Sequence, residues 1–320
     1  MEAAAILGSK KWTPKWGPFS GQFLASQALA FWQWCNFALR EASREPLVIN
    51  LDESSIGFHW SGLFGTVSDR EATDKVKSTT AKARATYICA VTHDPEVQQL
   101  LPQVLLGNTR CFTTAFVQQA AELFPHLVVW REKSAWNTQR LMAKYLRCLG
   151  DRLGPILETR QVYLLLDLAP CHLHDSLFDL AYTLGLRFLY IPPGMTSLLQ
   201  PCDSHVFAAF KHDLQETWRQ RKATALAGQV TLEIWLEIVA MAIAKLASKP
   251  WRHAFDSNGI FDRQQKASSA LLRKLGWAHV PLVPSALLTG ALDQFLFPVN
   301  WQGNAAKYIQ WNPHAVRTLD

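Results

Sequence analysis

The sequence lacks the marks of a secreted or membrane-bound protein. No run reaches the roughly 20 apolar residues that a membrane-spanning helix needs, and residues 1–20 contain no apolar core of a signal peptide. Its 6 cysteines include no Cys-x-x-Cys pair and have no spacing typical of a small disulfide framework. These absences predict an intracellular protein in a reducing compartment.

Charge of one sign is only slightly in excess. The 320 residues carry a formal net charge of +6, and the pI is about 9.0. This balance is compatible with a polyanionic partner but does not identify one. Because 49% of the residues are hydrophobic, the chain can bury a large core.

Two short apolar runs organise the centre of the chain, at 161–166 and 186–191. A helix-length interval separates them, which is typical of two buried parallel strands joined by a crossover helix. Asp167 follows the first run directly, and Asp203 follows the second after a proline-rich loop. Working residues of such sheets lie beyond the carboxyl ends of the strands, so both acids are predicted at one sheet edge.

A third apolar run, 46–51, ends in Asp52 and Glu53. Three strands that each deliver an aspartate suit two divalent cations, because hard cations such as Mg²⁺ take carboxylate oxygens. Two such ions can clamp the attacking and leaving oxygens of a phosphodiester. The sequence therefore predicts a phosphoryl-transfer site.

Three blocks carry a resemblance to a known family. They are Asn50-Leu-Asp52-Glu53-Ser54, Leu166-Asp167 with His172 five residues on, and Ile191-Pro-Pro-Gly-Met-Thr-Ser-Leu-Leu-Gln-Pro-Cys-Asp203. They resemble the catalytic blocks of the DDE superfamily endonuclease domain of pogo, Tigger and Jerky-like transposases, and the resemblance runs from about 46 to 260. It implies catalytic and metal-binding roles for Asp52, Asp167 and Asp203, two Mg²⁺ (or Mn²⁺) ions, DNA as partner, and a nuclear protein.

The order of elements predicts an α/β fold with a ribonuclease H-like mixed sheet flanked by helices. Strands at 84–91 and 101–106 come first, and the parallel strands with their helices come later. Helical spacing predicts further helices at 20–43, from Trp136 to Leu149 and from Thr231 to Leu246. We divide the chain into an N-terminal arm and helix (1–43), a DDE/RNase H-like catalytic domain (44–224) and a helical C-terminal extension (225–320).

Several residues near the acids could either support the active site or have a purely structural role. His172 either orients a metal-bound water or a phosphate, or is a loop histidine with its hydrogen bonds satisfied. Glu53 leaves the strand opposite Asp52 and supports the site without ligating the ions. Gln200 and Thr196 contact the nucleic-acid backbone or stabilise their own loop. Weak nucleic-acid contacts are assigned to Lys75, Lys77, Lys82, Arg84 and Lys211, which equally fit a solvated surface.

A rival metal site uses softer ligands. Cys171, His172 and His174, with Cys202, Asp203 and His205, could hold Zn²⁺. Their spacing matches no usual zinc motif.

Two departures from the family bear on function. The family commonly has Asn directly after the second acid, where this chain has Leu168. Residues 1–43 are too few for the family's paired helix-turn-helix modules, so DNA binding is predicted to be largely non-sequence-specific.

A homodimer is compatible with the sequence. The alternative function is a domesticated, catalytically weak or inactive nucleic-acid-binding module. Repulsion among the acids also predicts that Asp167→Asn stabilises the metal-free protein.

Overall fold

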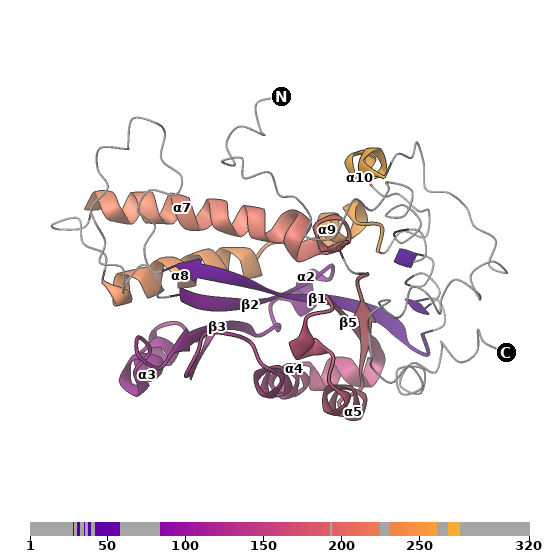
Figure 1. Ribbon diagram of the computed structural model, residues 1–320, viewed down its shortest axis with the longest axis horizontal. Helices are drawn as coiled ribbons and strands as arrows, with labels where there is room; N and C mark the ends of the chain where they lie inside the picture. Colours follow the sequence, from indigo (N-terminus) through magenta and orange to yellow (C-terminus); the bar gives the residue numbers. More distant parts are fainter. Residues whose placement is uncertain are drawn as a thin grey trace.

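The computed structural model describes residues 28, 31, 32, 35, 38, 39, 42–57, 84–192, 194–224, 231–260 and 268–275. Within them the chain forms a six-stranded sheet with the order β4-β3-β2-β1-β5-β6, covered by helices (Figure 1). The strands are β1 (Glu45–Gly57), β2 (Arg84–Thr92), β3 (Gln103–Asn108), β4 (Leu127–Glu132), β5 (Arg160–Leu166) and β6 (Leu186–Tyr190).

The sheet is mixed, and its two halves follow the order of the chain. β2 pairs antiparallel with β1 and with β3, whereas β5 pairs parallel with β1 and with β6. β3 and β4 are also parallel. An antiparallel meander followed by parallel strands is the predicted ribonuclease H-like arrangement, so the α/β fold class is confirmed.

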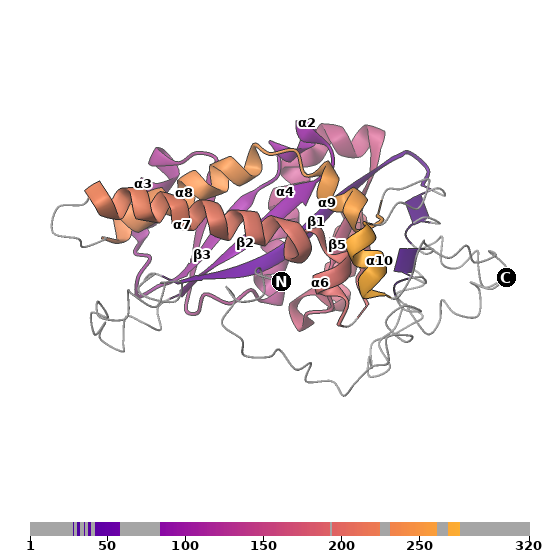
Figure 2. The same cartoon turned by 90° about the horizontal axis from the view of Figure 1, so that it is seen from above.

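Helices cover both faces of the sheet. α4 (Gln139–Thr159) and α5 (Asp175–Thr183) lie on one face, and α7 (Phe207–Thr224) and α8 (Leu232–Ala247) lie together on the other (Figures 1 and 2). The shorter helices are α2 (Pro95–Gln98), α3 (Thr114–Leu123), α6 (Thr196–Leu199), α9 (Arg252–Ser257) and α10 (Ser269–Lys274). Among the described helices, none combines the length and apolarity needed to cross a membrane.

The central strand β1 is buried on both faces. Leu47, Ile49 and Leu51 belong to the core under α4 and α5, whereas Val48 and Ile56 belong to the core under α7 and α8. Successive strand side chains point to opposite faces, so a strand between two helical layers needs apolar residues at nearly every position. This requirement explains the continuous apolar run at 46–51.

The predicted strands at 46–51, 84–91, 161–166 and 186–191 are confirmed, with two differences. β1 continues to Gly57 because β2 pairs with it along that whole length, so Asp52 lies inside a strand rather than after its end. β4 was not predicted. The helix predicted at 20–43 is confirmed at 28, 31, 32, 35, 38 and 39, where Phe31, Trp32 and Cys35 are buried, but Ala42 and Ser43 are not helical. Most of 261–320 lies outside the described residues.

A buried amide joins three of these segments. Asn50 on β1 is 0% exposed; its Nδ2 donates to the carbonyl of Leu165 at 2.9 Å, and its Oδ1 accepts from the backbone N–H of Cys202 at 2.7 Å. Asn50 therefore ties the end of β5 and the segment that carries Asp203 to the central strand.

We expect Asn50→Ala to lower the free energy of unfolding by about 2 kcal/mol or more, because each buried backbone group left unpaired costs about 1–3 kcal/mol. Denaturant unfolding measures the change. Ser55→Ala, at an exposed position of the same strand, is the matched control and should stay within about 0.5 kcal/mol of the wild type. An equal effect of the two substitutions would contradict the role of Asn50.

Candidate active site

Three aspartates reach the same edge of the sheet from three elements. Asp52 lies on β1 just beyond the last pair with β5, which is Asn50 with Leu165. Asp167 follows β5 directly, and Asp203 lies in the π-helical turn η3 (Cys202–Val206). Parallel strands deliver their carboxyl ends to one edge, and the Asn50 hydrogen bond brings in the third segment.

Asp52 is the most buried of the three, with 8% of its surface exposed. Burial raises its pKa well above the usual carboxyl range, and the charges of Asp203, Glu53 and Asp167 raise it further. The backbone N–H of Glu53, at 2.8 Å from Oδ1, partly opposes this shift. The carboxylates are thus close enough to repel one another.

Asp203 is exposed, but the surrounding protein still removes part of its hydration. This desolvation raises the pKa of Asp203, and the charge of Asp167 adds to the effect. Two groups lower the pKa of Asp203: the hydroxyl of Thr196, which donates to its carboxylate, and the positive charge of Lys211. Thr196 thus stabilises its own loop, which was one of its two predicted roles.

Asp167 differs because a histidine pairs with it. Its Oδ1 lies 2.8 Å from Nδ1 of His172 and accepts the backbone N–H of Ala169 at 3.1 Å. Burial raises the pKa of Asp167, but these partners outweigh burial and leave the pKa below its usual value.

His172 is 0% exposed. Burial lowers the pKa of its imidazole, but hydrogen bonds to Asp167, Cys171 and Glu53 outweigh burial and raise the pKa well above the usual range. In the absence of metal His172 is therefore a cation held between acids. Asp167→Asn would remove a negative charge that stabilises this cation, and the lowered pKa of Asp167 shows that the fold favours its ionised form, so the predicted stabilisation by that change is wrong.

Glu53 leaves β1 on the face opposite Asp52, as strand alternation requires. Its Oε1 lies 3.3 Å from Nε2 of His172 and accepts the side-chain amide of Asn137. Asn137 was not predicted as a site residue. The available signal was its place directly before Thr138, whose hydroxyl caps α4 by accepting the N–H of Leu141 at 3.3 Å.

The distances between possible ligand atoms distinguish the three aspartates from a second set, Glu53, Cys171 and His172. Among the described residues, the one group with ligand atoms all within 4.8 Å of one another is Glu53, Cys171 and His172. The three aspartates do not form such a group, so they are spread more widely than one shared ion requires.

The six residues of the rival zinc site are not brought together: among the described residues, only Cys171 and His172 of the six belong to a group of close ligand atoms. His174 caps α5, where its Nδ1 accepts the N–H of Ser176. His205 packs against the ring of His253, with centroids 5.9 Å apart, and Cys202 is fully buried.

The other predicted residues are less informative. Gln200 is fully buried, and neither atom of its side-chain amide has a hydrogen-bond partner in the described part of the chain, so the predicted loop-stabilising bond from this side chain is not made. Lys211 is exposed on α7, and Arg84 begins β2. Lys75, Lys77 and Lys82 lie outside the described residues.

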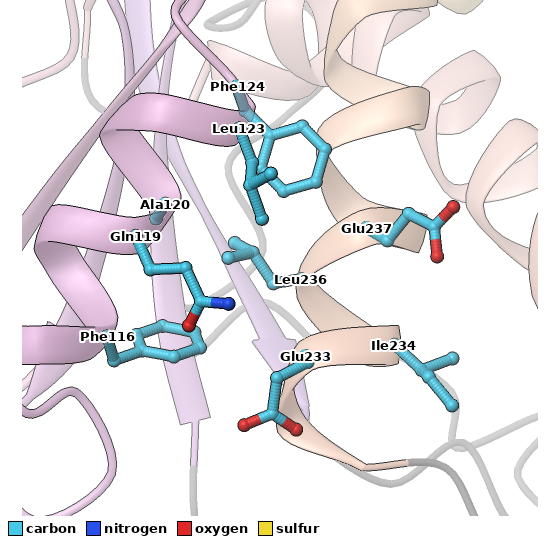
Figure 3. A pocket seen from close by; sticks show the side chains of 9 residues that line it. All are labelled: Phe116, Gln119, Ala120, Leu123, Phe124, Glu233, Ile234, Leu236 and Glu237. Carbon is cyan, nitrogen blue, oxygen red and sulfur yellow. The ribbon is translucent and has the colours of Figure 1, made fainter.

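A hollow of about 370 Å³ lies elsewhere, between α3 and α8. Its wall is mainly apolar, with two carboxylates, Glu233 and Glu237, on α8 (Figure 3). Glu237 is already paired with Arg221. The hollow contains none of the predicted site residues.

Comparison with known proteins decides the family. Residues 83–255, more than half of the chain, match the family described as DDE superfamily endonuclease. The chain belongs to this family. The match includes Asp167 and Asp203, whereas Asp52 lies before it. No curated protein matches the sequence significantly.

Solved structures similar to this DDE family member include complexes of the Mos1 transposase. The paired-end complex with the left transposon end is 15% identical with a TM-score of 0.38, and the match covers 79% of this chain and 68% of that one. The Mos1 mariner paired-end complex with Mn is 16% identical with a TM-score of 0.38, over 81% and 70%. The Mos1 strand transfer complex is 16% identical with a TM-score of 0.36, over 79% and 67%. Likeness at this level says nothing about the chemistry of this chain.

We expect Asp52→Asn to stabilise the metal-free protein at neutral pH. The folded-state pKa of Asp52 is raised, so folding loses stability as the pH rises from about 4, the ordinary pKa of an aspartate, through the folded pKa. The gain from Asn should therefore be small at pH 4 and grow towards pH 8. Melting temperatures in chelator across this range measure it.

The matched control is Asp151→Asn, which removes an exposed carboxylate from α4 and should give no pH-dependent gain. A gain for Asp52→Asn that stays constant with pH would show that charge repulsion is not its cause.

Proposed function

We propose that this DDE family member is a metal-dependent endonuclease that hydrolyses DNA phosphodiesters, with Asp52, Asp167 and Asp203 holding two Mg²⁺ or Mn²⁺ ions. The observation that supports the proposal most strongly is the gathering of three carboxylates at one sheet edge, where desolvation raises the pKa of Asp52 and of Asp203 and the charges of neighbouring acids raise it further. A cluster of like charges kept at one sheet edge is destabilising without a cation, and functional sites are where such shifts concentrate.

The spread of the carboxylates suits two ions better than one. Mg²⁺ binds oxygen at about 2.0–2.1 Å, and paired catalytic ions lie about 3.5–4 Å apart. Ligands of such a pair can be separated by more than the 4.8 Å that encloses the Glu53, Cys171 and His172 group.

The chain's own residues then have distinct tasks. Bound ions would activate the attacking water and stabilise the charge on the leaving oxygen. His172 and the N–H of Ala169 both hold Oδ1 of Asp167, which leaves Oδ2 to face a cation. Thr196 orients Asp203, and the positive charge of Lys211 nearby favours a phosphate. No protein nucleophile is required.

DNA is the proposed substrate, with contacts mainly to phosphates and little sequence preference from this chain alone. Joining of a released 3′-hydroxyl to target DNA, action as a homodimer and a nuclear location are parts of the same proposal. The alternative, a nucleic-acid-binding module without activity, rests on Leu168 in place of the family's Asn.

Replacement of Asp203 by Asn should lower Mg²⁺- or Mn²⁺-dependent cleavage of supercoiled DNA by about 10²-fold or more, because a ligand charge is lost where the ions stabilise the reacting oxygens. Asp203 is exposed, so the fold should survive. The rise in melting temperature caused by Mn²⁺ should shrink in parallel.

Asp151→Asn is again the control and should cleave at the wild-type rate. An Asp203→Asn protein that cleaves normally would overturn the proposed site. A wild-type protein that binds DNA and Mn²⁺ without cleaving would establish the inactive module instead.

DNA affinity should fall steeply with salt, since phosphate contacts release counterions. We expect Lys211→Ala to weaken binding equally for unrelated sequences and to reduce the slope of log affinity against log salt by about 1. Lys211→Arg retains the charge and should behave like the wild type. Fluorescence anisotropy in Ca²⁺ or chelator measures both. Tight binding to one short sequence, insensitive to salt, would contradict the proposal.

A further inference from the structure

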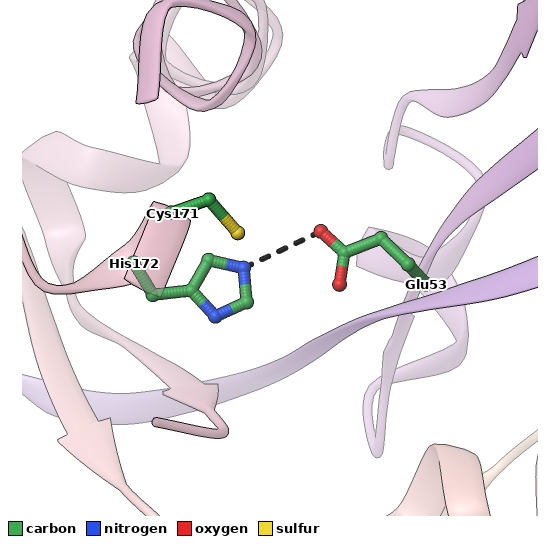
Figure 4. A group of neighbouring side chains, drawn as sticks. All are labelled: Glu53, Cys171 and His172. Atoms are coloured by element: carbon green, nitrogen blue, oxygen red, sulfur yellow. Dashed lines mark hydrogen bonds and ion pairs between the residues drawn. The ribbon is translucent and has the colours of Figure 1, made fainter. Parts of the chain in front are cut away.

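Glu53, Cys171 and His172 form a second cluster of metal-ligand atoms. Glu53 comes from β1, and the other two come from the 3₁₀ turn η2 (Pro170–His172) that follows β5. One oxygen, one nitrogen and one sulfur atom all lie within 4.8 Å of one another, and the three side chains converge in Figure 4.

The distance between two of these atoms fits a shared ion. Nε2 of His172 lies 3.3 Å from Oε1 of Glu53, which is longer than the usual 2.7–3.2 Å of an N–H···O hydrogen bond. Zn²⁺ binds imidazole nitrogen and carboxylate oxygen at about 2.0–2.2 Å, and tetrahedral geometry separates two such ligands by about 3.4 Å. The protein thus already holds this pair at the spacing of two ligands.

Hydrogen bonds from neighbouring residues also orient the ligands. Nδ1 of His172 is 2.8 Å from Asp167 and donates to it, whereas Nε2 faces Glu53 and would release its proton when a metal ion binds. A carboxylate behind a histidine is the usual support of a metal-binding imidazole. Asn137 donates to Glu53 and fixes that carboxylate. With His172 0% and the Glu53 side chain 18% exposed, little water competes for these groups.

The cluster is separate from the three aspartates. Glu53 points to the sheet face covered by α4, whereas Asp52 points to the opposite face, where Val48 and Ile56 pack under α7 and α8. Asp167 is the residue common to both sites, because it pairs with His172 and its charge also reaches Asp52.

We propose that Glu53, Cys171 and His172 bind one transition-metal ion of the Zn²⁺ class, apart from the Mg²⁺ or Mn²⁺ pair. Thiolate and imidazole ligands favour Zn²⁺ over hard cations. Three protein ligands leave a fourth position for water. An ion on Nε2 would fix the imidazole and, through Nδ1, the carboxylate of Asp167.

Cobalt(II) is the probe, because a cysteine thiolate bound to it produces a charge-transfer band in the near ultraviolet. The full chain, reduced and metal-free, is titrated with Co²⁺ and then with Zn²⁺. We expect the band to appear at one equivalent, to disappear on addition of Zn²⁺, and to be unaffected by excess Mg²⁺.

Matched variants assign the ligands. Cys171→Ser should abolish the band, whereas Cys111→Ser, at another half-buried cysteine, should retain it. Glu53→Gln should weaken Co²⁺ binding at least about ten-fold. Asp203→Asn should leave the band intact while the Mn²⁺-induced rise in melting temperature shrinks, and a cooperative melting transition in the metal-free state would show that the variants fold.

Two results would overturn the inference: no thiolate band in the wild type, or a band that persists in Cys171→Ser. Neither readout uses DNA or cleavage, so failure of the second metal site and failure of the proposed endonuclease are distinguishable.

Discussion

The two-sided burial of β1 is the constraint on which the site depends. Its side chains alternate between two helical layers, so neighbouring acids are delivered to opposite faces. Asp52 faces the layer of α7 and α8, and Glu53 faces His172 and the start of α4. Asn50 fixes this strand to the end of β5 and to the segment that carries Asp203. A shift of register by one residue would exchange the faces of all these groups.

Charge is balanced differently on the two faces. Desolvation raises the pKa of Asp52 and of Asp203, the charges of neighbouring acids raise both further, and the positive charge of Lys211 only partly offsets the shift at Asp203. Asp167 is held by His172, which Glu53 contacts from the other side. The raised pKa values on the face of Asp52 show that the carboxylates there are unfavourable in their ionised form. On the face of Glu53 the negative charge is balanced by the protonated imidazole of His172, whose Nε2 proton a metal ion could replace. Asp167 connects the two.

Patterns of apolar residues were sufficient to predict most of the sheet, because strands buried on both faces appear as unbroken apolar runs. They were also sufficient to place Asp167 after a strand. They did not predict that β1 extends to Gly57, since that length comes from pairing with β2, a non-local contact. The hydrogen bond of Asn137 to Glu53 and the pairing of Glu53 with His172 span 84 and 119 positions. No local pattern encodes such contacts. The prediction that Asp167→Asn stabilises the metal-free protein failed although His172 is only five positions away, because the positive charge of His172 depends also on Glu53, 119 positions away.

Leu168 takes the place of the family's Asn, and the structure allows the effect of this change to be assessed. The orientation of Asp167 comes from the Ala169 N–H and from Nδ1 of His172, both on Oδ1. Neither partner involves the side chain at position 168. Since His172 is fully buried and held by Glu53 on its far side, the carboxylate keeps its direction without an amide at position 168. Under the proposed function, the loss of this polar group is expected to affect turnover more than the positions of the acids. Retention of that geometry favours the endonuclease over an inactive module.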